Sequence, residues 1–394
     1  MMNKTHFRIL VFALPMLLAA CSADNETPDP WVAIRAKFAN TIDPDNLDNY
    51  ANQSRPAYIT RDNTGGNTIT NEKATLGRVL FYDKQLSIDN TIACANCHMQ
   101  EVGFGALAEV SKGVAGGRTA RHSMRLINAR FANEVKFFWD ERAVSLEDQT
   151  TRPIRDHAEM GFSGVDGRPS FSAVLEKLQA IGYYQELFKM AYGDTKVTEP
   201  RMQQSLAQFV RSIQSFDSKY DAGRIAVNAD NQPFTNFSQQ ENQGKIIFLT
   251  PPQFDPSGSR TGGGAGCAGC HAPPEFDIAP NSGNNGVTGK FNSTESDFSI
   301  TRAPSLRDLI RPDGFPHGPM MHDASKLTVE DVIEHYNAIP TQTGNTNLDP
   351  KLRPNGSLQK LNLTLQEKQA LIAFLKTLTG NAVYTDKRWS DPFK

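Results

Sequence analysis

The sequence predicts an all-α protein with two domains. Apolar residues recur at helical spacing over 199–215 and again over 364–378, as expected for helices that bury one face. Ser238–Glu241 and Thr364–Glu367 have the spacing of capping boxes, which open helices. Strand signals are sparse, and 394 residues are enough for two domains with complete cores.

The other elements follow in order along the chain. Further helices are predicted to begin near Asp29–Trp31, where an N-cap residue precedes a proline, and to cover 75–82, 170–190, 238–248 and a segment beginning at 328. The glycine-rich residues 103–117 predict a loop. The polar segment 221–237 predicts the connection between an N-terminal domain at 31–225 and a C-terminal domain at 235–394.

The motif Cys-x-x-Cys-His occurs once in each predicted domain, at 94–98 and at 267–271. It is the attachment site of a c-type haem, because two thiols at this spacing each form a thioether with the porphyrin and the following histidine ligates the iron. We therefore expect two cytochrome-c-like domains, each enclosing one covalently bound c-type haem. The attachment residues are Cys94, Cys97, Cys267 and Cys270, and the axial histidines are His98 and His271.

Cysteine pairs of this kind have three alternative uses: a zinc site, a structural disulfide or a redox dithiol. The pairs of a zinc ribbon usually lie about 15–20 residues apart, whereas these motifs begin at residues 94 and 267. A thioredoxin-like dithiol is expected near a βαβ pattern, which the sequence lacks. The histidine after each second cysteine favours haem.

Residues 1–20 predict a signal peptide, with basic residues before the apolar run 9–18. That run is too short to span a bilayer. Cys21 follows Leu-Ala-Ala and resembles the acylated cysteine of a bacterial lipobox, and an ordinary signal peptide with an incidental cysteine is the alternative. We expect a lipid anchor and tether at 21–30 and a location in the periplasm, at the outer membrane.

The composition narrows the class of protein further. The formal net charge of −2 gives no indication of a nucleic-acid partner. An apolar fraction of 39% together with 29 glycines and 23 prolines is typical of a globular, loop-rich protein. It argues against a disordered chain and against a bundle of membrane helices.

Four longer stretches carry a more specific pattern. They are LGRVLF at 76–81, FWDERA at 138–143, PIRDHAEM at 153–160 and APSLR at 303–307. They resemble the bacterial di-haem cytochrome c peroxidases and their relative MauG, and the resemblance extends from about Leu76 to the last predicted helix. It implies that hydrogen peroxide reacts at the N-terminal haem and that the C-terminal haem stores electrons.

The resemblance also implies a peroxide pocket with Gln149, Pro153 and Glu159. Heterolytic cleavage of peroxide moves a proton from one oxygen to the other, which a carboxylate can do as base and then as acid. Gln149 would orient the peroxide or a water. Trp139 matches the tryptophan between the two haems of the family, where an indole can pass electrons. The alternatives are a surface carboxylate for Glu159 and simple packing for Trp139.

The first haem site departs from the family pattern. Val114 stands where peroxidases of this family carry a removable histidine ligand, so we expect a first haem that is open at rest and needs no reductive activation. His122 replaces the asparagine usual at the calcium site of the family, which argues against calcium. His317 and Pro319 stand where the family offers carbonyl ligands, which keeps calcium as an alternative.

The second haem site departs as well. The helix that begins at 328 places Tyr336 where many relatives have a methionine ligand, and MauG likewise uses a tyrosine. A phenolate is hard and anionic and favours ferric or higher states, whereas a thioether favours ferrous iron. The alternative is that Tyr336 only packs and that Met320 or Met321 binds the iron. His322 resembles a nearby family histidine that is not a ligand.

The resulting hypothesis is an exported, lipid-anchored di-haem oxidoreductase that reduces hydrogen peroxide. Its electrons would come from a small c-type cytochrome or a cupredoxin, or from a tryptophan or tyrosine of a protein substrate. The alternative from another class is a non-catalytic di-haem electron-transfer cytochrome, in which both irons would be six-coordinate.

Overall fold

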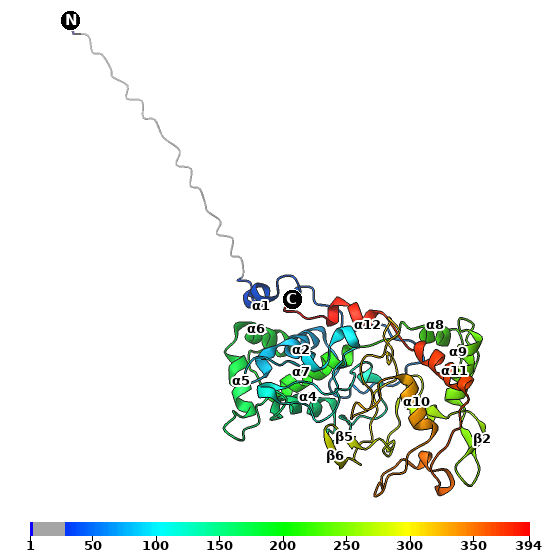
Figure 1. Cartoon of the computed structure of the whole chain (residues 1–394). Helices are drawn as coiled ribbons and strands as arrows, with labels where there is room; N and C mark the ends of the chain where they lie inside the picture. Colours follow the sequence, from blue (N-terminus) through cyan, green and yellow to red (C-terminus); the bar gives the residue numbers. More distant parts are fainter. Residues whose placement is uncertain (3–27) are drawn as a thin grey trace.

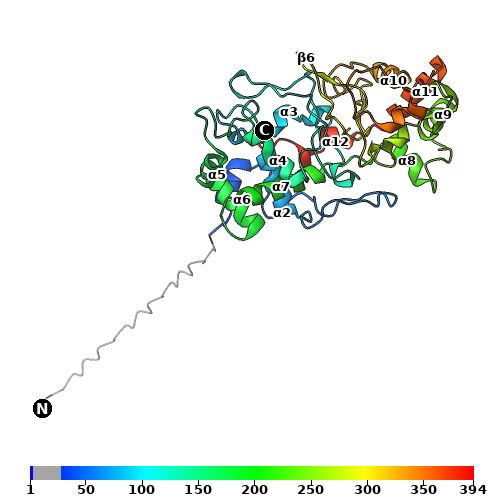
Figure 2. The ribbon, with the colours of Figure 1, turned by 90° about the horizontal axis from the view of Figure 1, so that it is seen from below.

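The computed structural model describes residues 1–2 and 28–394. The helices within 28–394 form two groups that lie side by side (Figure 1, Figure 2). Cys21 and most of the predicted signal peptide lie outside the described residues. The helices are α1 (Val32–Phe38), α2 (Asn71–Tyr82), α3 (Cys94–Cys97), α4 (Leu146–Arg155), α5 (Phe171–Gln179), α6 (Gly182–Tyr192), α7 (Glu199–Ser212), α8 (Lys219–Ile225), α9 (Gln239–Leu249), α10 (Val329–Asn337), α11 (Leu365–Lys376) and α12 (Ala382–Thr385). Over 28–394 no helix is both long and apolar enough to cross a membrane.

The prediction of an all-α fold needs correction, because the second half also contains small antiparallel sheets. The strands are β1 (Pro252–Phe254), β2 (Arg260–Gly263), β3 (His271–Ala272), β4 (Asp277–Ile278), β5 (Gly289–Lys290) and β6 (Ser293–Ser296), paired in that order. Each pair is a local hairpin within the long loops around the second motif. Strands of two to four residues are too short to show an alternating pattern in the sequence, so the fold is helix-rich with three small sheets.

The first group of helices is built around α2 and α7. A Cβ at Gly77 of α2 would lie only 2.0 Å from the carbonyl oxygen of Ser205 on α7, so a glycine is needed for this close approach. The rings of Phe81 and Phe209, from the same two helices, lie 5.1 Å apart in the buried core.

The second group repeats this arrangement with α9 and α11. A Cβ at Gly244 of α9 would lie 1.8 Å from the carbonyl oxygen of Ala370 on α11. Phe248 and Phe374 again bring their rings together, here at 5.2 Å. In both halves, therefore, a helix with an interior glycine precedes the Cys-x-x-Cys-His motif and packs on a helix that follows it.

The C-terminal tail, residues 382–394, returns to the first group of helices, as Figure 1 shows by the position of the C-terminus near α1. Trp389 is buried in the first core. Tyr50 donates a hydrogen bond to the carbonyl oxygen of Arg388 at 2.6 Å, and Tyr82 donates one to that of Trp389 at 2.6 Å. A tail that was predicted as part of the second domain thus contributes to the first core, while the predicted division near 225–235 stays a prediction.

The helix starts predicted from capping boxes are confirmed. Ser238 and Thr364 each accept a hydrogen bond from the backbone N–H of the N3 glutamate, and the carboxylate of each glutamate accepts one from the backbone N–H of the cap residue. The helix expected at 328 begins with the same device at Thr328. The helix predicted over 170–190 is instead two helices, α5 and α6, because the chain is extended at Ile181.

Candidate functional site

Two cavities of nearly equal volume, about 420 and 410 Å³, lie one in each half of the molecule. The predicted residues that line the first cavity are Cys94, Cys97, His98, Trp139, Gln149, Pro153 and Glu159. Those that line the second are Cys267, Cys270, His271, Trp139 and Tyr336. The structure therefore brings every predicted haem and peroxide residue to one of two cavities, with Trp139 at both.

The motif histidines are held in the same way in both halves. His98 Nδ1 lies 3.2 Å from the carbonyl oxygen of Phe104, and His271 Nδ1 lies 3.3 Å from that of Phe276. Nδ1 therefore donates and Nε2 is left as the unprotonated nitrogen, which is the state a metal ligand requires. Burial lowers the pKa of both imidazoles to about 4, so both stay neutral at physiological pH.

The cysteines are presented by single helical turns. Cys94 and Cys97 bound α3, and Cys267 begins a short 3₁₀ helix that ends just before Cys270. Residues three apart on a helical turn lie on the same face, and all four thiols are free of disulfides. Two thiols and one imidazole nitrogen at the wall of a largely apolar cavity fit a c-type haem in each half.

Gln149 and Pro153 lie one helical turn apart on α4 and face the first cavity. Because proline has no N–H, the carbonyl oxygen of Gln149 has no donor from residue 153 within the helix. A glutamine side chain offers both a donor and an acceptor. This side of the cavity can therefore orient a small polar molecule.

Glu159 lies just after α4, where its backbone is fixed at two points. Its N–H donates to the Asp156 carboxylate at 3.0 Å, and its carbonyl oxygen accepts from the N–H of Val114 at 3.0 Å. Burial is the main cause that raises the pKa of Glu159 to about 7; Asp156 raises it further and Arg142 lowers it. A carboxyl group with a pKa near neutrality can both accept and return a proton.

Val114 is buried and does not line the first cavity. Its loop packs closely on the turn before Glu159, since a Cβ at Gly113 or Gly117 would lie 1.9 or 2.2 Å from the carbonyl oxygen of Ala158. Among the described residues, the imidazoles at this cavity are those of His98 and His122. His122 uses Nδ1 to donate to the carbonyl oxygens of residues 108 and 109.

A shared wall separates the two cavities. Residues 122–125, Trp139, Arg302 and Pro304 line both of them. The indole of Trp139 is fixed here, because its Nε1 donates to the carbonyl oxygen of His122 at 2.7 Å. Its own carbonyl oxygen accepts from the N–H groups of Thr301 and Arg302, each at 3.0 Å. The position of Trp139 is therefore set by both halves of the chain.

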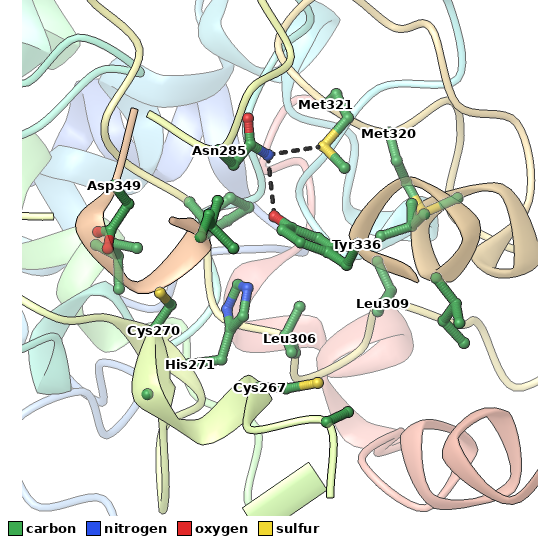
Figure 3. A pocket seen from close by; sticks show the side chains of 18 of the residues that line it. Cys267, Cys270, His271, Asn285, Leu306, Leu309, Met320, Met321, Tyr336 and Asp349 are labelled. Atoms are coloured by element: carbon green, nitrogen blue, oxygen red, sulfur yellow. Dashed lines mark hydrogen bonds between the residues drawn. The ribbon is translucent and has the colours of Figure 1, made fainter. Parts of the chain in front are cut away.

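Tyr336 of α10 directs its hydroxyl group into the second cavity, on the side that faces His271 (Figure 3). Asn285 Nδ2 donates to this hydroxyl oxygen at 2.9 Å. Burial raises the pKa of Tyr336, and the hydrogen bond from Asn285 opposes that shift. Met320 and Met321 line the same cavity, so the structure places both kinds of predicted ligand there.

The neighbourhood predicted for calcium contains His122 and His317, whose rings stack at 6.4 Å. His317 Nε2 contacts the guanidinium group of Arg125, and a fixed positive charge disfavours a second cation nearby. Within 28–394 no group of three or more His, Cys, Asp or Glu side chains could hold a metal ion. His322 donates from Nε2 to the carbonyl oxygen of Gly289 at 2.8 Å and lines the second cavity.

Two further residues at the cavities gave no sequence signal. Asn285 comes from the loop after the second motif. Glu275 comes from the same loop but lines the first cavity, where it is buried and accepts from Asn128 Nδ2 at 3.2 Å. Burial raises the pKa of Glu275 to about 7. Its position after a motif histidine, in a loop that crosses to the other half, becomes visible only in three dimensions.

Comparison with known proteins places this arrangement among haem enzymes. A sequence model of the family described as di-haem cytochrome c peroxidase matches residues 71–227. The methylamine utilization protein MauG of Methylophilus methylotrophus is 30% identical over 384 residues, which cover 96% of this chain and 97% of that protein. The cytochrome c551 peroxidase of Nitrosomonas europaea is 26% identical over 322 residues, which cover 79% of this chain and 80% of that protein.

Solved structures agree with the sequence comparison. A MauG-like protein associated with microbial copper homeostasis superimposes with a TM-score of 0.67 at 26% identity, covering 87% of this chain and 99% of that one. The di-haem peroxidase BthA of Burkholderia thailandensis has the same fold, with a TM-score of 0.61 at 19% identity and coverage of 80% and 87%. Fold and site thus define a protein of the di-haem peroxidase class. The chain belongs to the di-haem cytochrome c peroxidase and MauG family of haem peroxidase-type oxidoreductases.

Proposed function

We propose that this protein is an exported di-haem oxidoreductase that reduces hydrogen peroxide in the first cavity and stores the second oxidising equivalent in the second. The observation that carries the proposal is Glu159, a half-buried carboxyl group that lines the cavity containing His98 and whose pKa is raised to about 7. Burial of an ionisable carboxyl group costs stability, and such raised pKa values gather at functional sites. Moving a proton between two peroxide oxygens is favoured by a pKa near the operating pH.

The residues divide the work at the first cavity. Glu159 accepts a proton from the peroxide oxygen that binds and returns it to the oxygen that leaves as water. Gln149 orients the peroxide through its amide group, and Pro153 leaves the backbone carbonyl oxygen of Gln149 without a donor from within the helix. His98, fixed by the carbonyl oxygen of Phe104, would offer its Nε2 to the haem iron. A c-type haem held through Cys94 and Cys97 would supply the redox chemistry of this site.

In this proposal, a haem in the first cavity would have no protein ligand on the side opposite His98. Val114 supports it, because an aliphatic side chain that is buried away from the cavity cannot ligate iron. The loop around Val114 is also bonded to the backbone of Glu159, so the acid–base residue is in place without a rearrangement of this loop.

The second cavity differs from the first in the residue that faces its motif histidine. His271 and Tyr336 face each other across it (Figure 3), and Cys267 and Cys270 would hold a c-type haem there. A hard phenolate ligand favours the higher oxidation states of iron. Trp139 contacts both cavities and gives electrons an aromatic path between them.

The proposal extends to location and partners. Residues 1–20 direct export, and Cys21 carries the lipid that holds the protein in the periplasm, at the outer membrane. Electrons come from another protein: a small c-type cytochrome or cupredoxin donor, or a tryptophan or tyrosine side chain of a protein substrate. Calcium is not part of this proposal, because His122 and Arg125 occupy its expected neighbourhood.

The test is the rate at which Glu159→Gln reacts with hydrogen peroxide, followed by stopped-flow absorbance of the di-haem protein. We expect a loss of about 100-fold or more, the usual contribution of a positioned general acid–base group. Glu101→Gln is the control, because Glu101 is exposed and lines neither cavity. A Glu159→Gln rate equal to wild type would remove the acid–base role. A wild-type protein with two six-coordinate haems and no peroxide reaction would show an electron carrier instead.

A further inference from the structure

One side-chain amide in the second cavity contacts two candidate iron ligands at once. Asn285 Nδ2 lies 2.9 Å from the hydroxyl oxygen of Tyr336 and 3.5 Å from the sulfur of Met321 (Figure 3). Both of those side chains line the cavity that contains His271. A hydroxyl oxygen and a thioether sulfur are both acceptors, so the two protons of one NH₂ group can serve both.

The orientation of this amide is fixed by its surroundings. Asn285 Oδ1 accepts from the N–H of Val287 at 3.1 Å, which leaves the NH₂ group to face the cavity. The carbonyl oxygen of Asn285 accepts from Nε2 of His335 at 2.8 Å. Because His335 and Tyr336 are neighbours on α10, this loop holds the helix at two adjacent points.

Met321 is held in an unusual backbone conformation. Its φ angle is +68°, in the left-handed region that residues other than glycine seldom occupy. Such a conformation persists only where surrounding contacts impose it. The sulfur of Met321 and the hydroxyl oxygen of Tyr336 both contact Asn285 Nδ2. The two candidate ligand atoms are therefore neighbours, and only one of them can occupy the ligand position at a time.

We infer that Asn285 is a positioning residue that selects the outer ligand of the second haem iron. Its amide holds the Tyr336 oxygen toward the cavity and retains the Met321 sulfur at the side. This inference rests on the proposed ligation by Tyr336. Without the amide, the tyrosine loses a donor that stabilises its oxygen, and the softer sulfur is free to take its place. The choice between a hard and a soft ligand, and so the preferred oxidation state, would then depend on one asparagine.

The experiment uses the complete di-haem protein and reads out ligation, not activity. Resonance Raman bands of an iron–phenolate bond report Tyr336, and the near-infrared charge-transfer band of a thioether-ligated ferric haem reports methionine. Asn285→Ala removes both the donor and the turn to Val287. Asn285→Asp keeps an acceptor for the Val287 N–H but has no NH₂ group, so it separates the two roles. Asn347→Ala is the control, because that exposed amide only donates to the backbone of Phe298.

We expect wild type and Asn347→Ala to show the phenolate bands. Asn285→Ala and Asn285→Asp should both shift the ratio of tyrosine to methionine ligation by about tenfold or more, the effect of one net hydrogen bond. Adding Met321→Leu to Asn285→Ala should abolish the methionine band. Unchanged phenolate bands in both Asn285 variants would overturn the inference, as would a change in Asn285→Ala alone. If Tyr336→Phe leaves the wild-type spectrum unaltered, the premise of tyrosine ligation fails instead.

Discussion

The raised pKa of Glu159 predicts that this residue lowers the stability of the folded protein at neutral pH. The native pKa of about 7 lies above the ordinary value of 4.5. Between these values the native state binds a proton that the unfolded chain has released, so the stability decreases as pH rises, by about 1.4 kcal/mol per pH unit. Above pH 7 the cost is complete and amounts to roughly 3 kcal/mol.

Glutamine at this position has nearly the shape of the protonated acid but does not ionise. Glu159→Gln should therefore match wild type in stability at low pH and exceed it at high pH. Because the carboxyl group partly faces the cavity, we expect a difference of about 2 kcal/mol near pH 8 and less than about 1 kcal/mol near pH 5. A variant that is more stable but inactive would show that function, not folding, requires the carboxylate.

The assay is urea denaturation of the di-haem protein at both pH values. The free energies of unfolding of wild type, Glu159→Gln and the exposed control Glu101→Gln are compared, and equal m-values show that the difference is one of stability. The control should show no gap that depends on pH. The reasoning would be refuted if the gap between wild type and Glu159→Gln were the same at both pH values, or if Glu159→Gln were the less stable protein near pH 8.

Two more predictions follow from packing. Trp139→Phe keeps an aromatic ring in the shared wall but loses the hydrogen bond to His122, so we expect denaturation to show about 1 kcal/mol less stability. We also expect stopped-flow absorbance to show slower oxidation of the second haem after peroxide is added. An unchanged rate would exclude an electron path through the indole. Gly244→Ala should destabilise the fold by about 2 kcal/mol, because the added Cβ would lie 1.8 Å from the Ala370 carbonyl oxygen. The control Gly182→Ala, whose added Cβ would have its nearest neighbour at 3.5 Å, should be neutral or slightly stabilising. Equal melting temperatures for the two variants would contradict the close approach of α9 and α11.

Local interactions explain which parts of the fold could be predicted from the sequence. The starts of α9 and α11 were predictable because a capping box lies within four consecutive residues and needs no tertiary partner. The hairpins β1–β2, β3–β4 and β5–β6 were not, because their register depends on the loops they close. The return of residues 382–394 to the first core was also beyond local reasoning, since Trp389 pairs with Ser212, far away in the sequence.

The residues of the site likewise divide into those that a local motif specifies and those that depend on tertiary contacts. The thiols and axial histidines of a Cys-x-x-Cys-His motif are neighbours in the sequence, so the motif itself specifies them. Glu159 could be named only through the family resemblance, and its pKa arises from burial that the sequence does not show. Asn285 had no signal, because the two side chains that it contacts come from a different loop and from α10. Residues that position a ligand through a tertiary contact are therefore harder to predict than the motif residues that bind the haem.

The repeated frame of the two halves shows where their chemistry must differ. Each half has a glycine-mediated helix pair and a motif histidine held by the carbonyl oxygen of a buried phenylalanine. Phe104 and Phe276 even share a positive φ angle, 56° and 54°. The motif histidine is therefore held in the same way in both halves, whereas Glu159 lines the first cavity and Tyr336 lines the second. In the proposed function, Glu159 as a proton-transfer group at one cavity and Tyr336 as a hard ligand at the other separate peroxide cleavage from charge storage in two halves that are built alike.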